Sequence, residues 1–156
     1  MKILGIDPGT ATTGYGVIES KHGKLTLIEY GCIKTAKAKE PAERLLEIYN
    51  DLNKLIKKHK PKVVGVESVF FYKNVKTAIA VAQARGVVLL CIKKSKIKLA
   101  EFTPLQVKQT LTTYGRADKK QVQFMVKQLL NLTQTPKPDD AADALAVAIC
   151  AAHQQS

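Results

Sequence analysis

The sequence is short of cysteine and of acidic residues, and it contains no internal repeat. Its three cysteines, Cys32, Cys91 and Cys150, lie far apart in apolar surroundings, which excludes a local zinc motif or a disulfide framework and favours buried thiols in a cytosolic protein. No run approaches the roughly 20 apolar residues that cross a bilayer. The first residues do not resemble a signal peptide. We therefore expect a cytoplasmic protein with no membrane segment.

The scarcity of acidic residues leaves a strongly basic chain. Only 13 Asp and Glu oppose 25 Lys and Arg, so the formal net charge is +12. Such an excess favours polyanionic partners such as nucleic acid, although lysine can also serve solubility alone. The length of 156 residues and the apolar fraction of 46% are sufficient for one sizeable core, so we expect residues 1–156 to form a single domain.

Hydrophobic periodicity divides the chain into strands followed by alternating helices and strands. Short apolar runs predict strands over residues 2–7, 15–19, 25–34, 63–67 and 99–102. The first three, joined by short turns, predict an antiparallel meander at a sheet edge. Helical spacing and capping residues predict helices over 41–59 and 74–94, and from residues 104, 119 and 139 onward. This order predicts an α/β fold, a mixed five-stranded sheet flanked by helices.

Four carboxylates lie where the predicted elements begin or end. Asp7 and Glu67 each terminate an apolar strand, and parallel neighbouring strands would place both side chains at one sheet edge. Asp140 and Asp143 are spaced i, i+3 and therefore share one face in the first turn of the last helix. Taken singly, each Asp is typical of a turn or of a helix start.

Together the four carboxylates indicate a metal site. Without matching Arg or Lys they would repel one another and raise at least one pKa, and a divalent cation would relieve that repulsion. Ligands that are all oxygen select Mg²⁺ or Mn²⁺ over zinc. Two such ions about 4 Å apart can activate water and stabilise a leaving oxygen, so the residues predict phosphodiester hydrolysis.

Five ordered motifs resemble one known family. The segments Gly-Ile-Asp-Pro-Gly-Thr and Thr-Gly-Tyr-Gly-Val in residues 5–17 are similar to the opening of RuvC, the bacterial Holliday-junction resolvase. The other matching segments are Val-Glu-Ser-Val-Phe at 66–70, Gln-Ala-Arg-Gly-Val at 83–87, the basic stretches 106–109 and 119–122, and Asp-Ala-Ala-Asp-Ala-Leu-Ala at 140–146. The resemblance covers about residues 3–150 and implies an RNase H-like fold.

The resemblance also implies roles for individual residues. Metal-binding catalytic residues would be Asp7, Glu67, Asp140 and Asp143, the third of which is His in some family members. Lys108 and Lys119 would lie near the scissile phosphate, although such helix lysines are ordinarily solvated. Phe70, or its neighbours Phe71 and Tyr72, would stack on an unpaired base; ordinary core packing is the alternative for Phe70.

The family further implies an endonuclease that nicks four-way DNA junctions in paired, symmetric positions. A homodimer matches the two-fold symmetry of a junction, and the strongly apolar helix over residues 74–94 is the candidate interface. The branch-migration proteins RuvA and RuvB would be partners. Two alternatives are an actin-like ATPase, which needs two related lobes, and an RNase H-like nuclease that processes RNA or RNA–DNA hybrid.

Overall fold

The computed structural model describes residues 1–68 and 74–155. In these residues the strands are β1 (Lys2–Asp7), β2 (Thr12–Lys21), β3 (Lys24–Lys34), β4 (Val63–Glu67) and β5 (Lys98–Phe102). The helices are α1 (Pro41–His59), α2 (Val75–Lys94), α3 (Pro104–Thr112), α4 (Lys119–Leu129) and α5 (Asp139–Gln154). The element order predicted from the sequence is confirmed.

The strands form one mixed sheet in the order β3-β2-β1-β4-β5. The first three strands make the expected antiparallel meander, with β3 at the edge. Strand β1 pairs in parallel with β4, which pairs in parallel with β5. The carboxyl ends of β1 and β4 therefore meet at one edge of the sheet, where ligand sites of such sheets lie.

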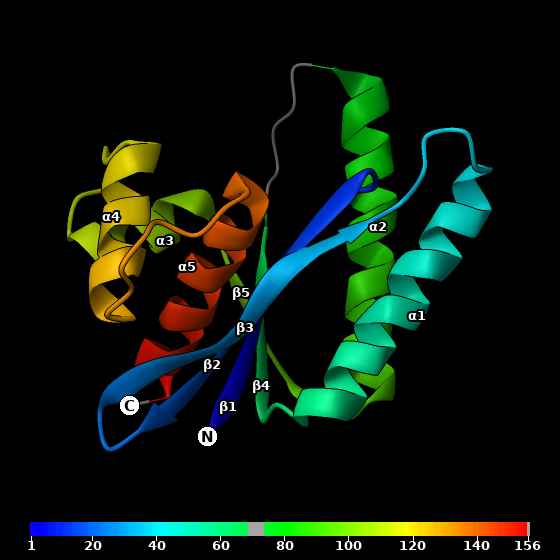
Figure 1. Cartoon of the computed structure of the whole chain (residues 1–156). Helices are drawn as coiled ribbons and strands as arrows, with labels where there is room; N and C mark the ends of the chain where they lie inside the picture. Colours follow the sequence, from blue (N-terminus) through cyan, green and yellow to red (C-terminus); the bar gives the residue numbers. More distant parts are fainter. Residues whose placement is uncertain (69–73, 156) are drawn as a thin grey trace.

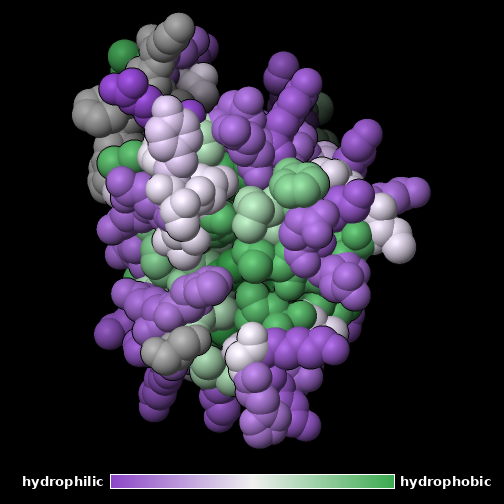
Figure 2. Space-filling model, turned by 90° about the vertical axis from the view of Figure 1, so that its left-hand side faces the viewer, coloured by the Kyte–Doolittle hydropathy of each residue, from purple (hydrophilic) through white to green (hydrophobic). Residues whose placement is uncertain are grey.

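Helices cover both faces of the sheet, so the protein has three layers (Figure 1). One face packs against α1 and α2, and the other packs against α5, with α3 and α4 outside it. The side that carries α3 and α4 shows apolar surface surrounded by hydrophilic side chains (Figure 2). Thr103 and Gln106 form the predicted capping box at the start of α3, and the predicted cap Asp118 forms a second one with Gln121 at the start of α4.

A row of glycines allows α5 to lie unusually close to the sheet. Gly5 of β1 is in register with Gly16 of β2 and with Gly65 of β4. A Cβ added at Gly5 would lie 1.9 Å from the carbonyl oxygen of Ala144 in α5. Because glycine has no side chain, the backbone of the alanine-rich α5 can pack directly on the central strands. This close contact fixes the position of the first turn of α5 above the end of β1.

Helix α2 corrects one expectation. By length and composition it is apolar enough to cross a membrane, contrary to the prediction that no such segment exists. Its inner face nevertheless packs on α1 and the sheet, and Arg85 near its middle forms an ion pair with Glu101. The outward apolar residues Val75, Ile79 and Leu90 lie on one side of the helix and are more than half exposed, at 73%, 56% and 57%.

The cysteines are free, as the sequence predicted. Cys91 and Cys150 are buried, but Cys32 is only partly buried, which corrects the expectation that all three thiols lie in the core. Cys32 lies on β3, the edge strand, where fewer neighbours cover a side chain.

Candidate metal centre

The site begins with the ends of two adjacent parallel strands. Ile6 of β1 is in register with Val66 of β4, so Asp7 and Glu67 follow at the same level of the sheet. The strands preceding both carboxylates are buried apolar segments, which hold the backbone rigidly. Both side chains therefore lie at one edge, and they interact strongly enough to shift each other's pKa.

Helix α5 adds two carboxylates from above the sheet. Asp7 is in register with Gly14 of β2, and a Cβ at Gly14 would lie 2.0 Å from the carbonyl oxygen of Asp140. The glycine therefore lets the first turn of α5 descend onto this corner. One carboxylate oxygen from each of Asp7, Asp140 and Asp143 lies within 4.8 Å of the other two. Such a group could hold a metal ion, with Glu67 beside it.

Crowding and burial make the deprotonated forms unfavourable. Burial, followed by the charges of Glu67, Asp143 and Asp140, raises the pKa of Asp7 from 3.8 to about 9. Burial and Asp143 also raise the pKa of Glu67, and burial raises that of Asp143. A neighbouring cation favours the charged form of a carboxylate, so this cluster has the electrostatics of a cation site.

A lysine lies beside the carboxylates, although from the sequence we expected no matching Arg or Lys. The amino group of Lys119, in the first turn of α4, lies 3.2 Å from a carboxylate oxygen of Asp143 and 3.4 Å from one of Asp139. The positive charges of Lys119 and Lys108 both act to lower the pKa of Glu67. Of the two lysines singled out from the sequence, Lys119 thus contacts the carboxylate cluster and Lys108 acts on it through its charge, while Phe70 lies outside the described residues.

A network that the sequence did not reveal supports the end of β4. Arg85 of α2 donates to Ser68 at 3.2 Å and forms an ion pair with Glu101 of β5. Ser68 also donates from its backbone to the carbonyl oxygen of Phe102 at 2.8 Å. Since Ser68 follows Glu67 directly, this network holds the backbone that carries the carboxylate. In the sequence, Arg85 stood out only as part of the segment Gln-Ala-Arg-Gly-Val at 83–87, which did not reveal its partners.

A metal ion suits this donor set. The candidate ligand atoms are all carboxylate oxygens, which Mg²⁺ and Mn²⁺ prefer and which zinc sites rarely use alone. The raised pKa of Asp7 gives independent support, because unrelieved repulsion among these carboxylates is what a divalent cation would offset.

Comparison with known proteins identifies the family. The model of the family described as crossover junction endodeoxyribonuclease RuvC matches residues 3–151. The chain belongs to the RuvC family. The crossover junction endodeoxyribonuclease RuvC of Syntrophomonas wolfei is 56% identical over 153 residues, which are 98% of this chain and 89% of that protein. The enzyme class predicted from the sequence, a metal-dependent endodeoxyribonuclease, is thereby supported.

Solved structures agree with this assignment. The RuvC of Thermus thermophilus in complex with a Holliday junction substrate superposes with a TM-score of 0.94 at 34% identity, covering 99% of this chain and 94% of that chain. The yeast mitochondrial Holliday junction resolvase shares the fold, with a TM-score of 0.70 at 17% identity over 98% of this chain and 79% of its own. These comparisons confirm the RNase H-like mixed sheet, and they give no support to the alternative of RNA or hybrid processing.

Proposed function

We propose that this RuvC family member resolves four-way DNA junctions in the cytoplasm, cutting them at the carboxylate cluster as a single-domain chain. Asp7, Glu67, Asp140 and Asp143 would hold two Mg²⁺ ions, which Mn²⁺ could replace. The observation that carries the proposal is the convergence of three carboxylate oxygens within 4.8 Å, beside Glu67, in a chain of this family. When bound, the ions supply Lewis acidity to the phosphodiester and to the attacking water.

The chain's own residues orient the substrate around that centre. The amino group of Lys119 already lies 3.2 Å from Asp143, so a phosphate seated at the carboxylates comes within its reach. The charge of Lys108 also acts on Glu67 and lowers its pKa. Both lysines would neutralise the scissile phosphate as it approaches four negative side chains. Phe70, or a neighbouring aromatic residue, would stack on a base at the opened crossover.

A homodimer joined through α2 would supply two centres for paired nicks. The exposed face of α2 combines large residues, Val75, Ile79 and Leu90, with the small residues Ala82 and Gly86 between them. A Cβ at Gly86 would meet nothing within 4 Å, so a second helix can approach the backbone closely there. Two-fold symmetry would set the two sites on two of the four strands of one junction. RuvA and RuvB would act upstream by moving the branch point.

The test is cleavage of a synthetic mobile four-way junction in Mg²⁺, beside a linear duplex and an RNA–DNA hybrid of equal length. We expect paired, symmetric nicks in the junction alone, and none without metal. Cutting of the hybrid but not of the junction would show that the proposed substrate is wrong.

The matched variant is Asp7→Asn, which removes one charge and keeps the shape of the side chain. It is expected to bind the junction but not to cut it. Cutting at the wild-type rate would overturn the metal site.

A further inference from the structure

A cavity of about 720 Å³ lies beside the turn that follows Asp7. Gly9, Thr10, Ala11 and Thr12 of the β1–β2 turn form one wall. The opposite walls come from the first turns of α2 and from α1 with the segment before it. The cavity thus lies on the face covered by α1 and α2, whereas α5 brings Asp140 and Asp143 from the other face. Nothing in the site described above uses it.

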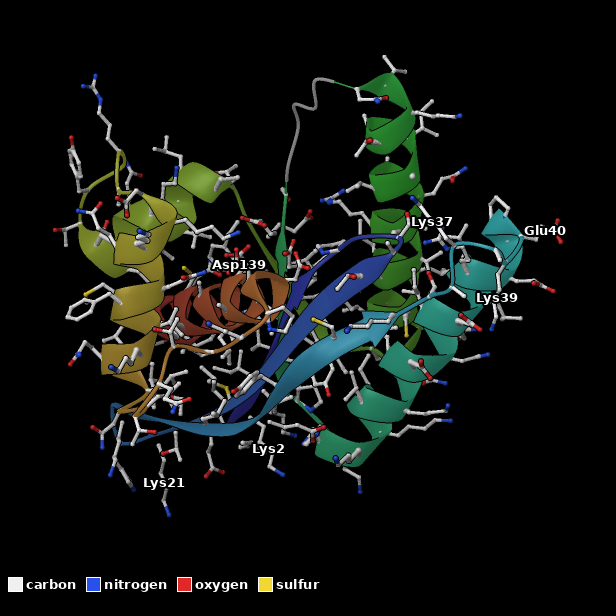
Figure 3. The ribbon with its side chains drawn as sticks, turned by 45° about the horizontal axis from the view of Figure 1, so that its top comes forward. Lys2, Lys21, Lys37, Lys39, Glu40 and Asp139 are labelled. Atoms are coloured by element: carbon white, nitrogen blue, oxygen red, sulfur yellow. The ribbon has the colours of Figure 1, made fainter. Side chains whose placement is uncertain are left out.

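Among the described residues that line this cavity there are three cations and no acidic residue. They are Lys37, Arg44 and Lys76, and Lys37 lies between α2 and the start of α1 (Figure 3). Two nearby lysines, Lys39 and Lys54, are paired with Glu47 and Asp51. Within residues 1–68 and 74–155, none of the three cations of the cavity has a carboxylate partner. A concave surface lined by charges of one sign attracts anions.

Arg44 is held in position by a chain of hydrogen bonds. Its Nε donates to the hydroxyl of Thr35 at 2.8 Å, and that hydroxyl donates to the carbonyl oxygen of Thr10 at 2.6 Å. Thr35 is buried, so this support is shielded from water. In the described part of the chain, the terminal amino groups of Arg44 have no partner. They are available to an anion in the planar geometry that suits phosphate.

The remaining walls fit a nucleotide. Ala11, Ala80 and Val81 present apolar surface to the cavity, which a sugar can cover. The first turn of α2 also contributes, with its N-cap Asn74 and with Thr77. The amino end of a helix carries partial positive charge and so favours a phosphate.

We propose that this cavity holds a phosphodiester group of the strand that is cut at the carboxylates. The inference rests on the proposed function. Thr10 follows Asp7 by three residues, so their Cα atoms are at most about 11 Å apart. Phosphates recur every 3.4 Å along the axis of one strand, so we expect the group bound here about three nucleotides from the scissile phosphate. The cavity would thereby set the direction in which the strand crosses the site.

The first test compares two triple variants that lose the same charge. One is Lys37→Ala, Arg44→Ala, Lys76→Ala; the control is Lys2→Ala, Lys21→Ala, Lys54→Ala, with Lys2 and Lys21 at the other end of the sheet (Figure 3). In metal-free buffer we expect the cavity variant to bind the junction about tenfold more weakly than the control. The slope of the logarithm of its binding constant against the logarithm of the salt concentration should be smaller in magnitude by about 1. If the two triple variants bind the junction equally and the wild type cuts it, the assignment of the cavity to a DNA phosphate is wrong. The proposed function is then unaffected.

The second test locates the phosphate. Junctions carry one neutral methylphosphonate at successive positions up to three nucleotides from the cut on either side. We expect one position to weaken binding by the wild type and to have no further effect on the cavity variant, because the two changes remove the same contact. Full additivity at every position overturns the assignment. If the triple variant does not fold, the double variant Lys37→Ala, Lys76→Ala serves, since both side chains are exposed.

A third measurement separates DNA from a free anion. Inorganic phosphate is added to the wild type and to the cavity variant, and the melting temperature of each is followed. Stabilisation of the wild type alone, together with equal binding of all methylphosphonate junctions, would assign the cavity to free phosphate and overturn its role on DNA. A wild type that neither binds nor cuts junctions would instead refute the proposed function itself.

Discussion

Helices α5 and α2 are both strongly apolar, yet they have opposite surroundings. In α5 every residue from Ala144 to Ala152 is buried, because the sheet lies on one side and α3 and α4 on the other. In α2 only Ala84, Val88, Cys91 and Ile92 are buried. An apolar helix in a three-layer protein is thus enclosed only when it lies between two other elements. The uncovered face of α2 is the one on which the proposed dimer depends.

The glycines at these two helices also have different surroundings. At the α5 contact, Gly5 is required because a Cβ there would collide with the backbone of Ala144. On α2, Gly86 faces open space. The first glycine therefore serves the packing of the chain's interior, whereas no described atom of the chain restricts the second. The difference gives four predictions.

The acidic start of α5 gives the largest expected effect. Asp143→Asn removes a carboxylate from the cluster and should lower single-turnover cleavage of a junction by about 10³-fold, the scale of losing one preorganised electrostatic group. Binding in metal-free buffer should not weaken, because a negative charge is lost. The control is Asp51→Asn on α1, which should cut as the wild type does. Cleavage by Asp143→Asn within tenfold of the wild type would remove Asp143 from the centre.

The contact between α5 and the sheet gives the next largest effect. Gly5→Ala should lower the free energy of unfolding by about 3 kcal/mol, because the backbone of α5 must shift to admit the methyl group. Gly86→Ala on α2 should raise it by about 0.5–1 kcal/mol through better helix propensity. Urea unfolding of the dilute chain measures both. Similar changes in the two variants would show that the comparison of the helices is wrong.

The exposed face of α2 is tested by Ile79→Glu. Ile79 is 56% exposed, so the change should leave the fold intact. Placing a charge in an apolar interface should raise the dissociation constant of the dimer by at least about 30-fold, or about 2 kcal/mol. Sedimentation equilibrium measures the constant, and circular dichroism checks the fold. An unchanged constant would place the dimer contact elsewhere.

The smallest expected effect concerns pH and the end of β1. The raised pKa of Asp7, about 9 against an ordinary 3.8, means that the protonated side chain stabilises the folded protein. Without metal, that stability is complete below about pH 4 and is lost as the pH rises towards 9. At pH 8 the free energy of unfolding of Asp7→Asn should therefore exceed that of the wild type by about 1–3 kcal/mol. At pH 4 the two free energies should be equal.

Mg²⁺ provides the control for this comparison. It should raise the melting temperature of the wild type at pH 8 and have little effect on Asp7→Asn. A wild type whose metal-free stability does not change between pH 4 and pH 8 would contradict the electrostatic strain assigned to the cluster.

Much of the fold could be predicted because strong local signals coincide. Alternating and continuous apolar runs marked the strands, and the capping residues Thr103 and Asp118 marked two helix starts that the structure has. The carboxylates Asp7 and Glu67 could be placed because each ends an apolar strand. The pairing of Lys119 with Asp143 could not be placed, because it depends on how α4 packs on α5. Nor could the contact of Arg85 with Ser68, which joins elements far apart in the sequence.

By itself, the sequence determined the order of the elements, the family and the four acidic positions, since these depend on residue type and local spacing. The tertiary structure decided which apolar helix is enclosed, because enclosure depends on the layers on either side. It also decided how close the carboxylates come, through the glycine row under α5, and it brought Lys37, Arg44 and Lys76 around one cavity. Distances between separate elements follow from packing, and packing is a property of the whole chain.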